Sequence, residues 1–328
     1  MNNFTFSVGK GNTFYDISQF ISRVVWSGRR GKAARTVEAT IMNSEMFGGI
    51  GTDTNVAEGK ICVLKDNDAG ITIFQGLIMS ERYNQKRQLV LKAYDMGVYL
   101  SNSKDSFTYK QKTADQIFRD CLNRCNGLPA GNVEGTGFVI NELVKKGTTY
   151  WDAIEDSLSQ TYLATGKRYY AYSENGKMNL ILRKPAKEMP VIELQTNVEQ
   201  YDYTRSIENT RTRLKIVTGK GTVKRTDVIN NLESKIGVFQ EFDSVDEKIS
   251  DSDLNKRVKT FRTEKGIVGQ TLTVTVTGDP KIKAGSTVYV KIDSLPIKRM
   301  MYVEEDTHTY EGGKHTMKLT MSFDPAQN

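Results

Sequence analysis

The chain has 328 residues, of which 38% are hydrophobic and 26% charged, and it carries a formal net charge of +7 at pH 7. This length suits two to four modest domains of a globular protein. Lys and Arg are interspersed with Asp and Glu, so the charge indicates a solvated surface and no specific nucleic-acid binding. No stretch approaches the roughly 20 apolar residues of a membrane span. No secretory signal is evident and only three cysteines occur, so we expect folding in a cytoplasm.

The first hundred residues are predicted to form a small β-barrel or sandwich. Alternating apolar and polar residues, many of them β-branched, indicate strands. The expected strands cover 21–28, 35–43, 59–66, 70–83 and 88–95. A loop rich in Gly, Asn and Asp is expected at 47–59. Several short strands separated by turns are typical of barrels and sandwiches.

At Thr113 the hydrophobic period changes from that of a strand to that of a helix. Thr113 and Gln116 have the spacing of a capping box. The residues that follow place one apolar face at helical spacing, formed by Ile117, Phe118, Cys121, Leu122 and Cys125. A second helix is predicted within 148–166, and the hairpin after it has Asn175-Gly176, which suits a type I′ turn.

The β character returns after a linker predicted at 184–190. The polar segment 244–266 has three apolar residues at helical spacing and is predicted to be a surface helix. We therefore predict an α+β, mainly β fold with two small β-barrel domains, an inserted helix-strand-helix-hairpin module, and a surface helix in the second barrel. The predicted domains are 1–105 (first barrel), 106–185 (module) and 186–328 (second barrel, with the helical insertion near 244–266).

Two stretches far apart in the chain have the same order of elements. The first begins with Gly59-Lys-Ile-Cys-Val-Leu and continues through FQGLIMSERY to QLVLKAYD. The second begins with Gly285-Ser-Thr-Val-Tyr-Val and continues through KRMMYVEEDTHTY, a turn at Gly312-Gly313, and HTMKLTMSF. This order predicts a duplicated β domain, although any two β meanders share such features, and a chance likeness stays open.

The sequence offers little catalytic chemistry. The two histidines, His308 and His315, flank the terminal turn and are predicted to be exposed strand residues. Two such ligands do not make a structural zinc site, and no nucleophile-elbow pattern occurs. We predict no catalytic residue, no cofactor and no metal.

The densest positive charge lies in GRRGKAAR at 28–35. Its spacing is not that of a phosphate-binding loop, and no aromatic residues are interleaved for base stacking. We expect this loop to contact an acidic partner. The predicted contact residues are Trp26, Arg29, Arg30, Lys32 and Arg35.

Several stretches resemble the baseplate hub proteins of contractile phage tails, above all those of PBSX-like prophages and R-type bacteriocins (late control protein D-like). VVWSGRRGKAARTVEA is similar to the early hairpin of that family, and GKICVLKD, IFQGLIMSERY and LVLKAYDMGVYLSNS are similar to its barrel strands. KQKTADQIFRDCL resembles the first helix of its module, and GDPKIKAGSTVYVKI its final-barrel hairpin. The resemblance covers nearly the whole chain.

The resemblance implies a structural baseplate hub. Such hubs are homotrimers whose two barrels per chain form a pseudo-sixfold ring between the sixfold tail tube and the threefold spike. The implied partners are the tail tube protein, the central spike protein, and baseplate wedge and adaptor proteins, with the tape measure protein as a further candidate; neither a membrane nor a specific nucleic acid is among them. The implied location is the bacterial cytoplasm during assembly, and then a phage tail or bacteriocin particle released on lysis.

Two alternatives stay open on the sequence alone. The first is a tail-associated peptidoglycan hydrolase or carbohydrate-binding protein. The sequence ends soon after the last predicted strand, without a fused lysozyme or peptidase domain, so we expect no enzyme. The second is a nucleic-acid-binding β protein driven by the charge of +7, whose signature would be salt-sensitive retention of DNA.

Overall fold

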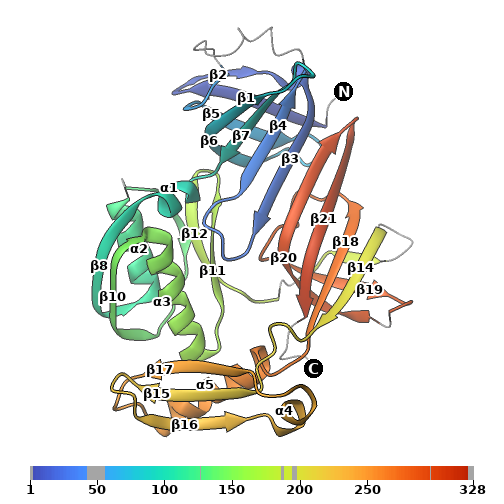
Figure 1. Cartoon of the computed structure of the whole chain (residues 1–328). Helices are drawn as coiled ribbons and strands as arrows, with labels where there is room; N and C mark the ends of the chain where they lie inside the picture. The colour runs from blue at the N-terminus through green and yellow to red at the C-terminus, as the bar shows by residue number, and fades with distance from the viewer. Residues whose placement is uncertain are drawn as a thin grey trace.

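The computed structural model describes residues 3–42, 56–125, 127–185, 188–193, 198–295 and 297–323. Their buried side chains form four hydrophobic clusters. Figure 1 shows the arrangement of the strands and helices that contribute to them. None of the helices in these ranges is long and apolar enough to cross a membrane. Most of the loop predicted at 47–59, and two residues of the linker predicted at 184–190, lie outside the described residues.

The N-terminal β unit holds the strands of the first hundred residues. It comprises β1 (Phe4–Lys10), β2 (Thr13–Asp16), the short 3-10 helix η1 (Ser18–Phe20), β3 (Ile21–Arg29), β4 (Thr36–Ile41), β5 (Ile61–Asp66), β6 (Ile71–Tyr83) and β7 (Leu89–Tyr94). Burial alternates residue by residue along β4, β5 and β7, because successive side chains of a strand point to opposite faces. The five predicted strands are confirmed, and β1 and β2 are additional.

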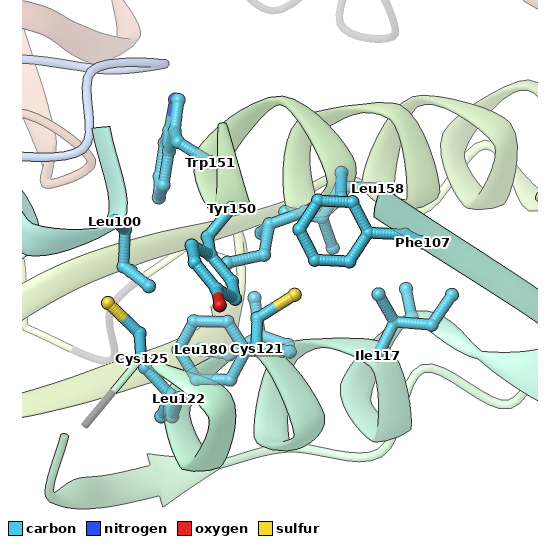
Figure 2. Close-up of a cluster of buried hydrophobic side chains, with 14 of the residues drawn as sticks. Leu100, Phe107, Ile117, Cys121, Leu122, Cys125, Tyr150, Trp151, Leu158 and Leu180 are labelled. Atoms are coloured by element: carbon cyan, nitrogen blue, oxygen red, sulfur yellow. The ribbon is translucent and has the colours of Figure 1, made fainter. Parts of the chain in front are cut away.

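The α/β module follows directly. It comprises α1 (Gly97–Asn102), β8 (Lys104–Thr113), α2 (Ala114–Arg124), β9 (Ala130–Val133), β10 (Val139–Thr149), α3 (Tyr150–Thr165), β11 (Tyr169–Glu174) and β12 (Lys177–Leu182). The predicted apolar face of α2 is buried beneath α3, as Figure 2 shows for Ile117, Cys121 and Leu122. The capping box at Thr113 is confirmed. The predicted hairpin turn is confirmed too, with φ of 51° and 71° at Asn175 and Gly176.

A second capping box begins α3. Thr149 accepts a hydrogen bond from the Asp152 amide, and its own amide donates to the Asp152 carboxylate, both at 3.0 Å. We expect Thr149→Ala to lower the free energy of unfolding by about 1 kcal/mol, measured by urea denaturation, because the Asp152 amide loses the hydroxyl that accepts its hydrogen bond. Ser159→Ala at an exposed position of the same helix is the control, with an expected change within about 0.5 kcal/mol. Equal effects would contradict the capping role.

The C-terminal β unit contains the predicted terminal hairpin. It comprises β13 (Val191–Glu193), β14 (Val198–Ser206), β18 (Gly269–Thr277), β19 (Thr287–Ile292), β20 (Ile297–Glu311) and β21 (Lys314–Phe323). The long strand β20 pairs with β19 over its first half and with β3 over its second half. The two β units therefore share one thirteen-stranded sheet. The sequence predicts the two units but not the ladder that joins them.

A small sheet unit is inserted between β14 and β18. It comprises β15 (Arg213–Thr218), β16 (Val223–Val228), α4 (Asn230–Ile236), β17 (Gln240–Val245) and α5 (Asp251–Glu264). The helix predicted near 244–266 is α5. Its Leu254, Val258 and Phe261 are buried against the three-stranded sheet β16-β15-β17, where they form a core of their own. α5 therefore packs on a separate sheet and not on the strands of the C-terminal β unit.

The two β units repeat one topology. Neighbouring strands follow the order β1-β5-β6-β7-β4-β3 in the N-terminal unit and β13-β19-β20-β21-β18-β14 in the C-terminal unit. Strands at matching places in the two sheets also occur in the same order along the chain. One departure is that β13 runs parallel to β19, whereas β1 runs antiparallel to β5. The predicted duplication is confirmed at the level of strand order.

The two β units also share individual hydrogen bonds and β-bulges at matching positions. The Gly59 amide donates to the Ile78 carbonyl, and the Gly285 amide donates to the Val303 carbonyl, both at 2.8 Å. Both glycines have positive φ, 82° and 94°. The bulge of β6 against β7 follows Ile78, and the bulge of β20 against β21 follows Val303. Ile78 therefore corresponds to Val303, and this correspondence aligns the two units residue by residue.

Candidate functional site

The ladder between β3 and β20 is the junction of the two β units (Figure 1). Its register runs from Glu305 opposite Arg29 to Glu311 opposite Arg23. Ion pairs close both ends on the outer face, with 2.9 Å between the Arg29 and Glu305 side chains and 3.6 Å between those of Arg23 and Glu311. On the inner face lie buried polar side chains, which is unusual for a strand pair and marks the junction as the candidate site.

A buried ion pair holds the centre of the junction. Asp306 accepts hydrogen bonds from both terminal nitrogens of the Arg35 guanidinium, the Nη1 bond being 2.9 Å long, and from the Ala284 amide at 2.6 Å. The guanidinium lies over the Trp26 ring, with Cζ 4.1 Å from its centroid. Asp95 accepts from the Arg35 amide at 3.1 Å, and burial raises the pKa of Asp95 to about 6. The planar fork of Arg35 thus links Trp26 of β3 to β20, and the Arg35 amide ties the same residue to the end of β7.

A chain of aromatic and imidazole groups continues from this pair. His308 Nε2–H donates to the Ile282 carbonyl at 2.9 Å, which leaves Nδ1 to accept from His315 Nε2–H at 2.9 Å. The His315 ring stacks on Tyr310, whose hydroxyl donates to Asp66 at 2.9 Å. Burial lowers the pKa of His308 to about 4 and also lowers that of His315. Both imidazoles are therefore neutral at pH 7.

The prediction that both histidines are exposed is wrong. The His308 and His315 side chains are 0% and 9% exposed. Register places Tyr310 opposite His315 and His308 opposite Trp26, so the rings turn toward the N-terminal β unit. The sequence could not reveal this face, because β3 lies almost a full chain length away from β20. Within the described ranges, no group of three or more His, Cys, Asp and Glu side chains is placed to hold a metal ion.

The predicted contact residues lie in or beside this junction. Trp26 and Arg35 are buried inside it, and Arg29 pairs with Glu305 on the surface. Arg30 binds Glu304, as does Arg183 at 2.8 Å. Burial alone would raise the pKa of Glu304, but these two guanidinium groups hold it at about 2.

The remaining predicted residue, Lys32, is exposed. The basic loop at 28–35 thus finds acidic partners within the chain, in the Glu304-Glu305-Asp306 run of β20. A contact of Arg29, Arg30 or Lys32 with another chain stays a prediction.

Sequence reasoning missed the acidic members of the site, Asp66, Asp95 and Asp306. A signal for Asp306 is present in VEEDTHTY, where charged residues occupy both faces of a strand. If only one face of such a strand is solvated, the other face is buried, and a charged side chain on the buried face requires a partner. The arrangement fixes the two β units against each other, because its charged and imidazole groups hydrogen-bond to one another and to the backbone, although Trp26 Nε1 and Arg35 Nε are buried without a partner. Asp306 and His308 are 1% and 0% exposed and cannot meet a substrate.

Comparison with known proteins agrees with this architecture. A tail protein from Neisseria meningitidis MC58 aligns with 98% of this chain and 97% of its own, with a TM-score of 0.75 and 15% identity. The E. coli c3393 protein, a component of the type VI secretion system with structural similarity to the T4 bacteriophage tail proteins gp27 and gp5, aligns with 92% of this chain and 73% of its own, with a TM-score of 0.59 and 10% identity. The chain therefore shares its fold with these two proteins.

The family follows from the sequence match. The YQBQ-like family model matches residues 24–322, and the chain belongs to this family. A relative is the phage-like element PBSX protein XkdQ of Bacillus subtilis (strain 168), which is 32% identical over 300 residues that cover 89% of each chain. The predicted relationship to PBSX-like prophage proteins is confirmed.

Proposed function

We propose that the chain is the structural hub of a contractile-tail baseplate. Three copies would form a closed ring whose six similar β units meet the sixfold tail tube on one side and the threefold spike on the other. The observation that carries this proposal is the duplication, in which both β units share strand order, bulge position and the glycine bond to the central strand. A subunit with two like units can satisfy both symmetries at once.

The junction supports this role. A ring closes only if the angle between successive units is fixed, and a bidentate ion pair with a stacked tryptophan resists rotation more than an apolar contact does. The β11–β12 hairpin of the module also lies against the C-terminal β unit. Lys283 binds Glu174 at 2.5 Å, and its ammonium lies 4.9 Å from the Tyr172 ring centroid. Both contacts would keep the two units in one orientation.

The partners proposed for such a hub are the tail tube protein, the central spike protein, and wedge and adaptor proteins of the baseplate, with the tape measure protein as a further candidate. Assembly would take place in the bacterial cytoplasm, and the product would be a tail or bacteriocin particle. The proposed domains are 1–105, 106–185 and 186–328. The role needs regular strands and complementary surfaces and no catalytic group.

Two measurements test the proposal. The full chain, at increasing concentration or together with its tube protein, is expected to give a mass of three copies by native mass spectrometry, with no stable six-copy species. On a zymogram of bacterial cell walls, the purified chain is expected to leave the gel opaque. A clear lysis band would favour the peptidoglycan hydrolase alternative, and a monomer at every concentration and with the tube protein would contradict the hub.

A further inference from the structure

The last part of β6 has one edge without a neighbouring strand in the described part of the chain, whereas the corresponding edge of β20 is paired with β3. β5 pairs with β6 only as far as Leu77, and beyond it β7 alone continues along one side as far as Tyr83. No other strand of the described ranges pairs with this last part of β6. In the C-terminal β unit, β19 likewise stops at Tyr302 of β20, but the freed edge of β20 is taken by β3. A free strand edge of this kind is a template for pairing.

The strand that matches β3 is also half paired. β3 lies between β4 and β20, whereas its counterpart β14 pairs with β18 alone among the described strands. Both strands carry the same irregularity, a register shift between Ile21 and Arg23 in β3 and between Val198 and Gln200 in β14. The open edges of β6 and β14 lie in different units, far apart on the large sheet (Figure 1).

We propose that β14 of one copy adds as an antiparallel strand to the open edge of β6 in the next copy. This contact would repeat, between chains, the β3–β20 junction found within the chain. The inference rests on the ring proposed above and names the surfaces that would close it. Each copy uses one edge of each kind, so the contact is head-to-tail and a ring of copies leaves neither edge free.

The internal junction supplies the register. Ile78 corresponds to Val303, which makes Glu81 the counterpart of Asp306, and the β14–β18 pairing makes Arg205 the counterpart of Gly28. Asp306 lies opposite Gly28 in the chain. When the register of the β3–β20 junction is applied to β14 of one copy and β6 of the next, the expected opposite residues are Ser80 with Ser206, Glu81 with Arg205, Arg82 with Thr204, and Tyr83 with Tyr203.

Charge favours this register. Within the chain, Asp306 receives the guanidinium of Arg35, which fills the space above Gly28. Between copies, the residue at the place of Gly28 is itself an arginine, Arg205, and it faces Glu81. Arg205 is exposed and pairs with no acidic side chain of the described ranges. The pKa of Glu81 is raised by burial and then by the nearby Glu58 carboxylate, so a guanidinium opposite Glu81 would offset the repulsion between these two carboxylates.

An aromatic pair repeats as well. His308 lies opposite Trp26 in the internal junction, with ring centroids 4.7 Å apart. The corresponding pair between copies is Tyr83 and Tyr203. Cross-strand aromatic pairs stabilise antiparallel strands. The proposed contact between copies therefore places an acidic residue opposite an arginine and one aromatic ring opposite another. The internal junction likewise pairs an acidic residue with an arginine and an imidazole with an indole ring.

Disulfide trapping tests the register directly. The Arg30 amide donates to the Glu304 carbonyl at 2.8 Å, so by alternation Thr307 and Ser27 form a non-hydrogen-bonded pair with close Cβ atoms. Arg82 and Thr204 are the counterparts of these residues. The full chain carrying Arg82→Cys and Thr204→Cys is expected to form a covalent three-copy species on mild oxidation, seen in non-reducing denaturing gels. The native cysteines are buried and do not compete.

Two control pairs isolate the claim. Arg82→Cys with Arg205→Cys is offset by one residue and places the thiols on opposite faces, so no cross-link is expected. Thr204→Cys with Tyr15→Cys tests the other open edge, β2. Cross-linking by either control as efficiently as by the main pair would overturn the register. A three-copy mass without the main cross-link would overturn it and leave the ring standing, whereas absence of both would remove the ring as well.

Charge reversal gives an independent readout. Glu81→Arg and Arg205→Glu are each expected to weaken association of the copies roughly tenfold or more, measured by analytical ultracentrifugation, because each places like charges opposite each other. The double variant is expected to recover most of the loss. Failure of the double variant to recover would contradict the pairing of these two residues.

Discussion

Asp306→Ala is expected to lower the free energy of unfolding by about 3–5 kcal/mol, because it leaves the buried guanidinium of Arg35 without its counter-charge. Asp306 is 1% exposed and Arg35 9%, so water cannot replace the lost carboxylate. Urea denaturation followed by circular dichroism measures the change.

Glu305→Ala is the matched control for this substitution. Glu305 precedes Asp306 on the same strand and pairs with Arg29, but the two side chains are 43% and 63% exposed. An exposed pair of this kind contributes about 0–1 kcal/mol. Arg35→Met combined with Asp306→Leu removes both charges and is expected to be far less destabilising than Asp306→Ala alone. Equal losses for Asp306→Ala and Glu305→Ala would contradict the role given to the buried pair.

Acidification is expected to weaken the junction through His308. The pKa of His308 is about 4 in the folded chain, against an ordinary value of 6.5, because burial disfavours the imidazolium and because Nδ1 already accepts from His315. Between these values the unfolded chain binds a proton that the folded chain does not. The contribution of His308 to stability is therefore present above pH 6.5 and is lost as the pH falls to about 4, by on the order of 3 kcal/mol.

A difference measurement isolates this effect. Asp95 acts in the opposite direction, since its raised pKa makes the folded chain bind a proton more readily as the pH falls through 6. The free energy of unfolding should therefore be measured from pH 7 to pH 4 for the natural chain and for His308→Gln, which keeps Asp95 but cannot titrate at position 308. The advantage of the natural chain over the variant is expected to shrink toward pH 4. A constant difference across this range would contradict a neutral, buried His308.

Local patterns predicted many elements because their cause is local. The alternation of 59–66 and 88–95 indicates strands, and β5 and β7 occupy these positions. Thr113 and Gln116 predicted the start of α2 through a contact three residues apart. The strand β1 was missed, although Phe4, Phe6 and Val8 alternate in the same way and are buried.

Features that depend on distant contacts were not predictable in this way. α5 was expected on the surface because its three apolar residues form a thin stripe, but β15 and β17 cover that stripe. The inward orientation of His308 follows from the pairing of β20 with β3, which no local period encodes. The prediction of a duplication was confirmed because it relied on the order of strands, which the two β units share although their sequences differ.

Three chains, each with two like β units, are proposed to form one collar, and cryo-electron microscopy of the intact particle tests this most directly. We expect three chains at the level between tube and spike, with six β units in near-sixfold arrangement and β14 of each chain beside β6 of its neighbour. Six chains at that level, or a ring in which the two β units of a chain occupy unlike positions, would contradict it.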